Sequence, residues 1–146
     1  MTQATVTLVD GMQFVVATGS GHSFIIDSVP EVGGYDTGPR PFELLAAGLA
    51  GCTGMDVISI LRTMRQKPTG LKVHVTSERA TDHPKKFLSI HIEYTVIGYD
   101  LSEDRVARAI ELSETKYCPA MASLRPGAPI TSSYKILEAS EETMTK

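Results

Sequence analysis

One long apolar stretch, from Pro41 to Arg65, most limits what this chain can fold into. Between Leu44 and Leu61, Cys52 is accompanied by only three polar side chains, which are Thr53, Asp56 and Ser59. A helix that is apolar on every side is normally buried on every side. The stretch therefore predicts a central helix that the rest of the chain surrounds.

The ends of this helix carry typical signals. Pro41 suits the first helical position, and Glu43 falls in the first turn, where a carboxylate favours the positive end of the helix dipole. Pro68 and Gly70 are expected to end the helix. The interior glycines each cost about 1 kcal/mol relative to alanine, so we expect another backbone to approach the helix closely.

Size and charge restrict the function. A chain of 146 residues is expected to form one domain, spanning residues 1–146. The net charge of -3 and the absence of a glycine-rich phosphate loop argue against nucleic acid as a partner. The N-terminus has neither the basic nor the apolar region of a signal peptide, which favours the cytoplasm and reduced or redox-active cysteines.

The central stretch is also about long enough to cross a membrane, at roughly 18–20 residues. Asp56 near its middle would cost roughly 2.5–3.5 kcal/mol at the bilayer centre, and no other segment is comparably apolar. We therefore expect no membrane partner.

The rest of the chain reads as an α+β fold of order β-β-β-α-β-β-α-β. Three alternating segments around the Asp10-Gly11 turn predict a meander at 4–9, 12–18 and 22–27. Residues 28–40 form a loop, either a functional lid or a plain connection. Residues 139–146 form a polar tail.

A hairpin follows the central helix, with strands at 71–80 and 85–97 and its turn centred on Asp82-His83. One face is then apolar and the other polar, as in a half-buried antiparallel pair. The opposing pairs are Leu71/Tyr94, Val73/Ile92 and Val75/Ile90 inside, and Lys72/Glu93, His74/His91 and Thr76/Ser89 outside. The two histidines lack the spacing of a metal site, so we expect no metal.

The last third contains a helix and a strand. Ser102 is a suitable N-cap for a helix whose buried stripe comprises Val106, Ala109, Ile110, Ser113 and Tyr117. Pro119 ends that helix and opens a short one at 119–124, with Cys118 as its cap. Residues 129–137 predict the final strand.

Two thiols are the main candidates for chemistry, because a thiolate is a strong nucleophile. Apolar neighbours disfavour a thiolate at Cys52, which is then either a small buried residue or a thiol activated by a cation from elsewhere. Cys118, at a helix start, is better placed for ionisation. Asp56 either bonds a neighbouring backbone or hydroxyl group, or forms a wall of the cysteine pocket.

The segments PFELLAAGLAGCTGMDV and KYCPAMASL resemble the OsmC/Ohr family of thiol-dependent peroxidases, and the element order matches over the whole chain. The resemblance implies an intertwined homodimer with the central helices at its core and active sites at the subunit interface. It implies that Cys52 attacks organic hydroperoxides and becomes a sulfenic acid. Cys118 would resolve it to a disulfide, with Glu43 as the family's glutamate. No bound cofactor is implied, but an external dithiol such as dihydrolipoamide is.

The chain departs from the family pattern at two places. The peroxidases use an arginine from the N-terminal strands, whereas residues 1–30 contain no arginine or lysine, only Gln13 or His22 near that place. Glu43 comes one residue later than the family's glutamate, about 100° further round the helix. Arg40 is another candidate cation. The alternative function is therefore a dimer that binds a small apolar or lipoyl-like ligand without efficient peroxidase activity.

Overall fold

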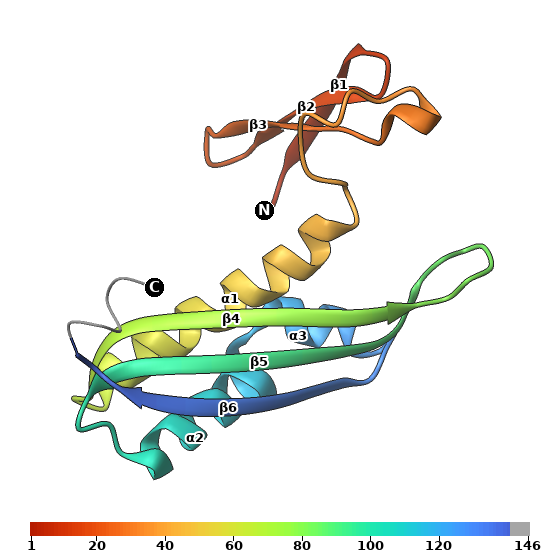
Figure 1. Ribbon diagram of the computed structural model, residues 1–146. Coiled ribbons are helices and arrows are strands. Elements are labelled where there is room, and N and C mark those ends of the chain that lie inside the picture. Colours follow the sequence, from red (N-terminus) through yellow and green to blue (C-terminus); the bar gives the residue numbers. More distant parts are fainter. Residues whose placement is uncertain (141–146) are drawn as a thin grey trace. The chain divides into compact units, whose positions relative to one another are not determined.

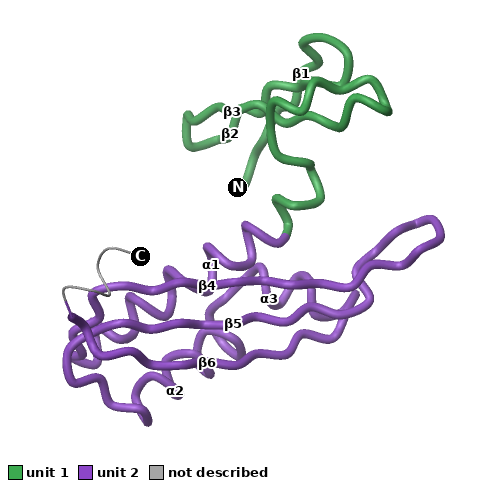
Figure 2. Tube along the Cα trace, viewed as in Figure 1, with its two compact units in different colours: residues 1–45 green, residues 46–146 purple. Residues whose placement is uncertain are grey.

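The computed structural model describes residues 1–140, and most of the polar tail predicted at 139–146 lies outside that range. The chain divides into two compact units, residues 1–45 and residues 46–146, shown in green and purple in Figure 2. Each unit is described by itself. The fold is α+β, and its order of strands and helices agrees with the prediction.

The N-terminal unit contains the predicted antiparallel meander, with the strand order β1-β2-β3 (Figure 1). The strands are β1 (Ala4–Asp10), β2 (Gln13–Thr18) and β3 (Ser23–Ile26). Asp10 pairs with Gln13, so the two-residue turn is Gly11-Met12, one residue later than predicted. Gly11 has a φ of 52°, a backbone conformation that costs glycine little and that side chains disfavour.

The loop after β3 is organised by a buried carboxylate that the sequence analysis did not identify. Asp27 is 2% exposed and accepts hydrogen bonds of 2.7–3.1 Å from the N–H groups of Ser28, Tyr35 and Thr37 and from the Thr37 hydroxyl. Burial raises the pKa of Asp27, but these hydrogen bonds outweigh burial and lower the pKa to about 2. The loop is therefore held in one arrangement by a charge, and it includes the 3-10 turn η1 (Pro30–Val32).

Helix α1 (Glu43–Thr63) begins two residues after Pro41. Its end differs from the prediction, because Pro68 and Gly70 do not stop the helix but lie in β4 (Lys67–Arg79). The order β4-β5-β6 makes β4 an edge strand, and an edge strand tolerates a residue that lacks an N–H donor. The pairing of β4 with β5 is also irregular between Pro68 and Gly70, as in a bulge.

The prediction that α1 is buried on every side is wrong for the single chain. Only one face is buried, and its residues are Leu49, Thr53, Gly54, Val57 and Leu61. Met55 on another face is 77% exposed. The reason is that the C-terminal unit has one sheet, and one sheet covers one side of a helix. By length and hydropathy α1 resembles a membrane span, a property that core helices share.

The glycines of α1 also lie on both the buried and the uncovered face. A side chain added at Gly54 would place its Cβ 3.3 Å from Val73 Cγ2, so this glycine lets β4 approach the helix. At Gly48 and Gly51 an added Cβ would meet no neighbouring heavy atom of the described chain within 4 Å. Within the described chain, Gly54 is therefore the one of these three glycines with a close neighbour, and that neighbour is a side chain and not the predicted backbone.

The hairpin of β4 and β5 (Phe87–Tyr99) has the predicted faces but a different register. Leu71 pairs with Val96 and Val73 with Tyr94, so each partner lies two residues beyond the predicted one. A shift of two residues keeps every side chain on its face, which is why the apolar pattern could not detect it. His74 lies opposite Glu93, and the predicted pairing of His74 with His91 is wrong.

The C-terminal unit is completed by a helical connection and a parallel strand. The connection comprises α2 (Glu103–Leu112), the π-helical turn η2 (Ser113–Tyr117) and α3 (Pro119–Leu124). It leads to β6 (Ile130–Glu138), which pairs parallel to β5 (Figure 1). The Ser102 side chain accepts a hydrogen bond from the Arg105 N–H, which confirms the predicted N-cap of α2.

The helices pack against alternate residues of β5, which are Ile90, Ile92, Tyr94 and Val96, all at most 2% exposed. The predicted stripe of α2 is buried through Ser113, but Tyr117 is 50% exposed. The Cys118 N–H donates to the Ser113 carbonyl five residues earlier, which inserts a residue into the helical repeat. That insertion turns Tyr117 out of the stripe.

A candidate thiol pair in the C-terminal unit

The structure brings the two cysteines of the chain together. Cys52 lies in α1 and is half-buried, whereas Cys118 immediately precedes α3 and is 4% exposed. Both are free thiols. The Cys52 thiol contributes to the raised pKa of the Cys118 thiol, so the two side chains lie near each other although 66 positions separate the residues in sequence (118 minus 52).

The two thiols have unequal surroundings. Burial raises the pKa of the Cys118 thiol, the Met121 N–H opposes this with a hydrogen bond of 3.4 Å to Sγ, and the neighbouring Cys52 raises the pKa further. The cap at Cys118 is therefore as predicted, but the prediction that a helix start ionises this thiol is wrong. Burial raises the pKa of Cys118 by more than the backbone N–H groups of a 6-residue helix lower it. Cys52 is the more exposed of the two residues.

A buried polar cluster lies next to the thiol pair. The Thr53 hydroxyl is 2.8 Å from the Tyr94 hydroxyl and 2.8 Å from the Ser113 hydroxyl. Ser113 donates to Asp56 at 3.0 Å, and Tyr94 donates to Glu114 at 3.2 Å. Burial raises the pKa of Tyr94 well above its usual range, so this hydroxyl stays protonated. The cluster joins α1, β5 and η2 directly beside Cys52.

Sequence reasoning identified only part of this cluster. Asp56 was expected either to bond a neighbouring group or to line the cysteine pocket, and the Ser113 hydroxyl is the neighbouring group it bonds. Thr53, Ser113 and Tyr94 were treated as members of a helix, a stripe and a strand. Their signal was the presence of three hydroxyl groups at positions predicted to be buried, because buried hydroxyl groups need partners.

Glu43 has a capping role in the N-terminal unit. Its Oε2 accepts the Arg40 N–H at 2.9 Å, as the glutamate of a capping box does from the residue that precedes the helix. The structure therefore gives Glu43 a helix-start contact of the kind that such a carboxylate usually makes. The thiol pair belongs to the other unit.

The three residues considered in place of the family's arginine are hydrogen-bonded to other residues of the N-terminal unit. Arg40 pairs with Asp36 at 2.5 Å and donates to the Gly38 carbonyl at 2.9 Å. Gln13 donates to the Thr37 hydroxyl at 2.7 Å, and His22 is bonded to Ser20 at 3.0 Å. Among residues 1–140, no group of three His, Cys, Asp or Glu side chains is arranged to hold a metal ion.

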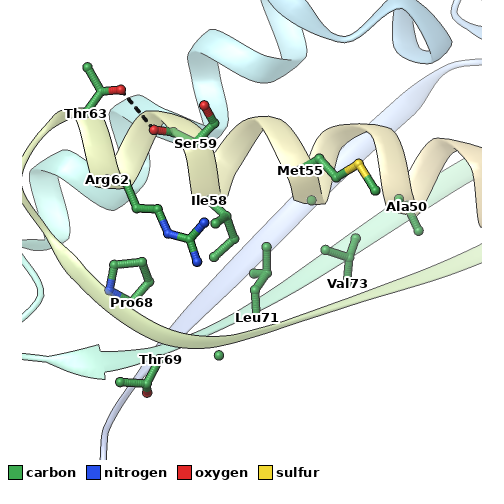
Figure 3. A pocket seen from close by; sticks show the side chains of 13 residues that line it. Ala50, Met55, Ile58, Ser59, Arg62, Thr63, Pro68, Thr69, Leu71 and Val73 are labelled. Atoms are coloured by element: carbon green, nitrogen blue, oxygen red, sulfur yellow. Dashed lines mark hydrogen bonds between the residues drawn. The ribbon is translucent and has the colours of Figure 1, made fainter.

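A groove of about 930 Å³ runs between α1 and β4 in the C-terminal unit (Figure 3). Its walls are mainly apolar, with Met55 and Ile58 on the helix and Leu71 and Val73 on the strand. The Arg62 guanidinium lies between helix and strand toward the Pro68 end. The groove thus combines apolar walls with one cation near its end.

Comparison with known proteins identifies the family. Residues 34–133 match the family of OsmC-like proteins, a range that includes both cysteines. Protein YhfA of Escherichia coli strain K12 is 36% identical over 137 residues, which are 94% of this chain and 99% of that protein.

Solved structures share the fold over nearly the whole chain. A hypothetical protein from Aquifex aeolicus VF5 has a TM-score of 0.84 at 26% identity, covering 96% of this chain and 98% of that one. The organic hydroperoxide resistance protein OhrB of Bacillus subtilis has a TM-score of 0.61 at 21% identity, covering 91% and 98%. The match to the family model and the identity to YhfA agree with the resemblance noted in the sequence: the chain is a member of the OsmC-like protein family.

Proposed function

We propose that the protein is a thiol-dependent peroxidase that reduces organic hydroperoxides with Cys52 and Cys118. The observation that carries this proposal is the proximity of two free thiols of unequal exposure, of which Cys52 raises the pKa of Cys118. Peroxide reduction by a cysteine pair needs one sulfur that the substrate can reach and a second one within bonding distance. Membership of a family that includes organic hydroperoxide resistance proteins supports the same reaction.

The proposed reaction has two steps on the protein. The Cys52 sulfur attacks the distal oxygen of the hydroperoxide, the O–O bond breaks, and the alcohol leaves with a proton, which oxidises Cys52 to a sulfenic acid. The Cys118 sulfur then attacks the Cys52 sulfur, and the sulfenic oxygen leaves as water with the Cys118 proton. The protein is left with a disulfide, and an external dithiol such as dihydrolipoamide returns it to two thiols with two electrons and two protons.

A homodimer is part of the proposal. The uncovered face of α1 presents Met55, which is 77% exposed, and an open notch at Gly48 and Gly51. Large apolar side chains beside such a notch suit the close packing of a second helix. A second copy of the chain would cover this face, which belongs to the helix that carries Cys52.

The peroxidase is tested by turnover of cumene hydroperoxide with dihydrolipoamide. We expect Cys52→Ser to abolish turnover, since it removes the attacking sulfur. Cys118→Ser should still consume one peroxide per chain but should not form the intramolecular disulfide. Thr115→Val, on the exposed side of η2, is the control and should match the wild type. Equal turnover in the wild type and Cys52→Ser would sink the proposal.

A second function, ligand binding without efficient peroxide chemistry, is favoured by two observations. Arg40 is paired with Asp36, and residues 1–30 offer no arginine or lysine to activate Cys52. The groove between α1 and β4 has the apolar walls that a small apolar or lipoyl-like ligand would contact. Alkylation of Cys52 as a function of pH separates the two functions. A thiol that reacts only above about pH 8.5, the value of an unperturbed cysteine, supports binding, and one that reacts near pH 6 supports the enzyme.

A further inference from the structure

We propose that Ser113 is a positioning residue that holds the backbone of Cys118 against the turn of α1 that carries Cys52. The inference rests on the proposed function in one respect, that the reacting unit is the Cys52–Cys118 pair. Within residues 1–140 the Ser113 side chain makes no hydrogen bond to either thiol, and it acts through Thr53 and through the backbone.

The two ends of Ser113 make different contacts. Its carbonyl accepts the Cys118 N–H at 2.9 Å, which is the bond that closes the π-helical turn. Its hydroxyl is 2.8 Å from the hydroxyl of Thr53, the residue that follows Cys52 in the chain. One residue therefore links the segment of the first thiol to the segment of the second.

The hydroxyl of Ser113 is held at two points on the same helix. Ser113 donates to Asp56 at 3.0 Å, because a carboxylate only accepts, and its oxygen lies 2.8 Å from the Thr53 hydroxyl. Thr53 and Asp56 are three positions apart on α1 and so lie on neighbouring turns of one face. Thr53 and Ser113 are both 0% exposed, and buried polar contacts of this kind fix side-chain geometry.

The π-helical turn sets the position of Cys118 relative to Ser113. If α2 continued as an α-helix without the extra residue, Cys118 would be rotated by about 100° round the helix axis. With the extra residue of η2, Ser113 stays on the buried stripe and Cys118 caps α3 near the thiol of Cys52. Insertions of this kind occur frequently at functional sites. A preorganised pair forms its disulfide at a higher effective concentration of thiol.

The test measures the dithiol–disulfide equilibrium of the whole chain in glutathione buffers. Cys52 and Cys118 lose two electrons and two protons to oxidised glutathione, which becomes two molecules of reduced glutathione. Alkylation and intact mass count the remaining thiols. Two variants break the link, Ser113→Ala by removing its hydroxyl and Thr53→Val by replacing the partner hydroxyl with a methyl group of similar size.

Each variant loses two buried hydrogen bonds, and we expect both to lower the effective thiol concentration by at least about two- to tenfold, the range for losing one. Thr53→Ser keeps the hydroxyl and should stay near the wild type. Thr115→Val, which loses a hydroxyl of the same turn that bonds only the Glu111 carbonyl, should equal the wild type. Urea titration of the reduced proteins restricts the comparison to folded chains, in which a merely structural role would leave the equilibrium unchanged.

Three results would overturn the inference. They are wild-type equilibria in Ser113→Ala and Thr53→Val, an equal loss in Thr115→Val, and a wild type that forms no intramolecular disulfide. A wild type with the expected disulfide equilibrium but no peroxide turnover would instead overturn the proposed function and leave the role of Ser113 standing.

Discussion

Asp27 illustrates how one residue can organise a loop. Its carboxylate accepts hydrogen bonds from three backbone N–H groups and one hydroxyl, and these contacts draw residues 28–37 around it. The glycines allow the approach, since a side chain at Gly34 would collide with the Ser28 backbone. A loop that reads as glycine-rich and irregular is therefore specified by a charged residue just before it.

The stability of this loop should depend on the charge of Asp27. The pKa of Asp27 is lowered to about 2 in the folded chain, from about 3.9 in an unfolded one, so its stabilising contribution is complete above about pH 4. The contribution should fall as the pH drops from about 4 to about 2. Hydrogen exchange at the Tyr35 and Thr37 amides should be faster in Asp27→Asn than in the wild type at pH 6. Equal protection in the two proteins would contradict this prediction.

At the scale of elements, α1 has two faces with different requirements. Gly54 meets β4 through Val73, whereas Gly48 faces open space within the chain. The same residue type therefore serves contact between a helix and a strand at one position and leaves a notch at the other. The hydropathy of the helix is high on both faces, so it does not distinguish them.

Substitutions at the two glycines should have opposite effects on the chain. Gly54→Leu places a large side chain against Val73 and should destabilise folding by about 1–3 kcal/mol through overpacking. In the single chain, Gly48→Ala adds a methyl group in open space and should stabilise the helix by up to about 1 kcal/mol. Urea unfolding at low micromolar concentration measures both. If both substitutions lowered the free energy of unfolding equally, contact with β4 would not explain the loss at Gly54.

At the scale of the whole molecule, the uncovered face of α1 is the reason for proposing a homodimer. The prediction from sequence was a helix buried on all sides, and the C-terminal unit buries one of them. The sequence and the single chain agree if another chain supplies the remaining cover. This would explain why a helix with so few polar residues remains exposed at Met55.

A charge placed on this face should prevent the association. Met55→Glu would bury a carboxylate in an apolar interface and should shift the protein from about twice its chain mass to the 15.8 kDa of one chain. Sedimentation equilibrium measures the change. Lys135→Glu, on the edge strand β6, is the control and should leave the mass unaltered. A wild type that already sediments as a single chain would refute the dimer.

Sequence alone was sufficient for the kinds of elements and their order. The meander, the long helix, the hairpin faces and the cap at Ser102 follow from local periodicity and turn chemistry, which act over a few residues. The pair of motifs around Cys52 and Cys118 was sufficient for the family. Local patterns carry this information because each element must present an apolar face whatever it packs against.

Tertiary structure decided what depends on contacts between distant residues. The hairpin register differs from the prediction by two residues, because the apolar pattern repeats every two and cannot distinguish the alternatives. The ionisation of Cys118 was misjudged because burial, which no local pattern reports, outweighs the helix start. The neighbourhood of the two thiols and its hydroxyl cluster exist only once α1, β5 and η2 are packed together, since hydrogen bonds between buried side chains require positions that only the fold brings within about 3 Å.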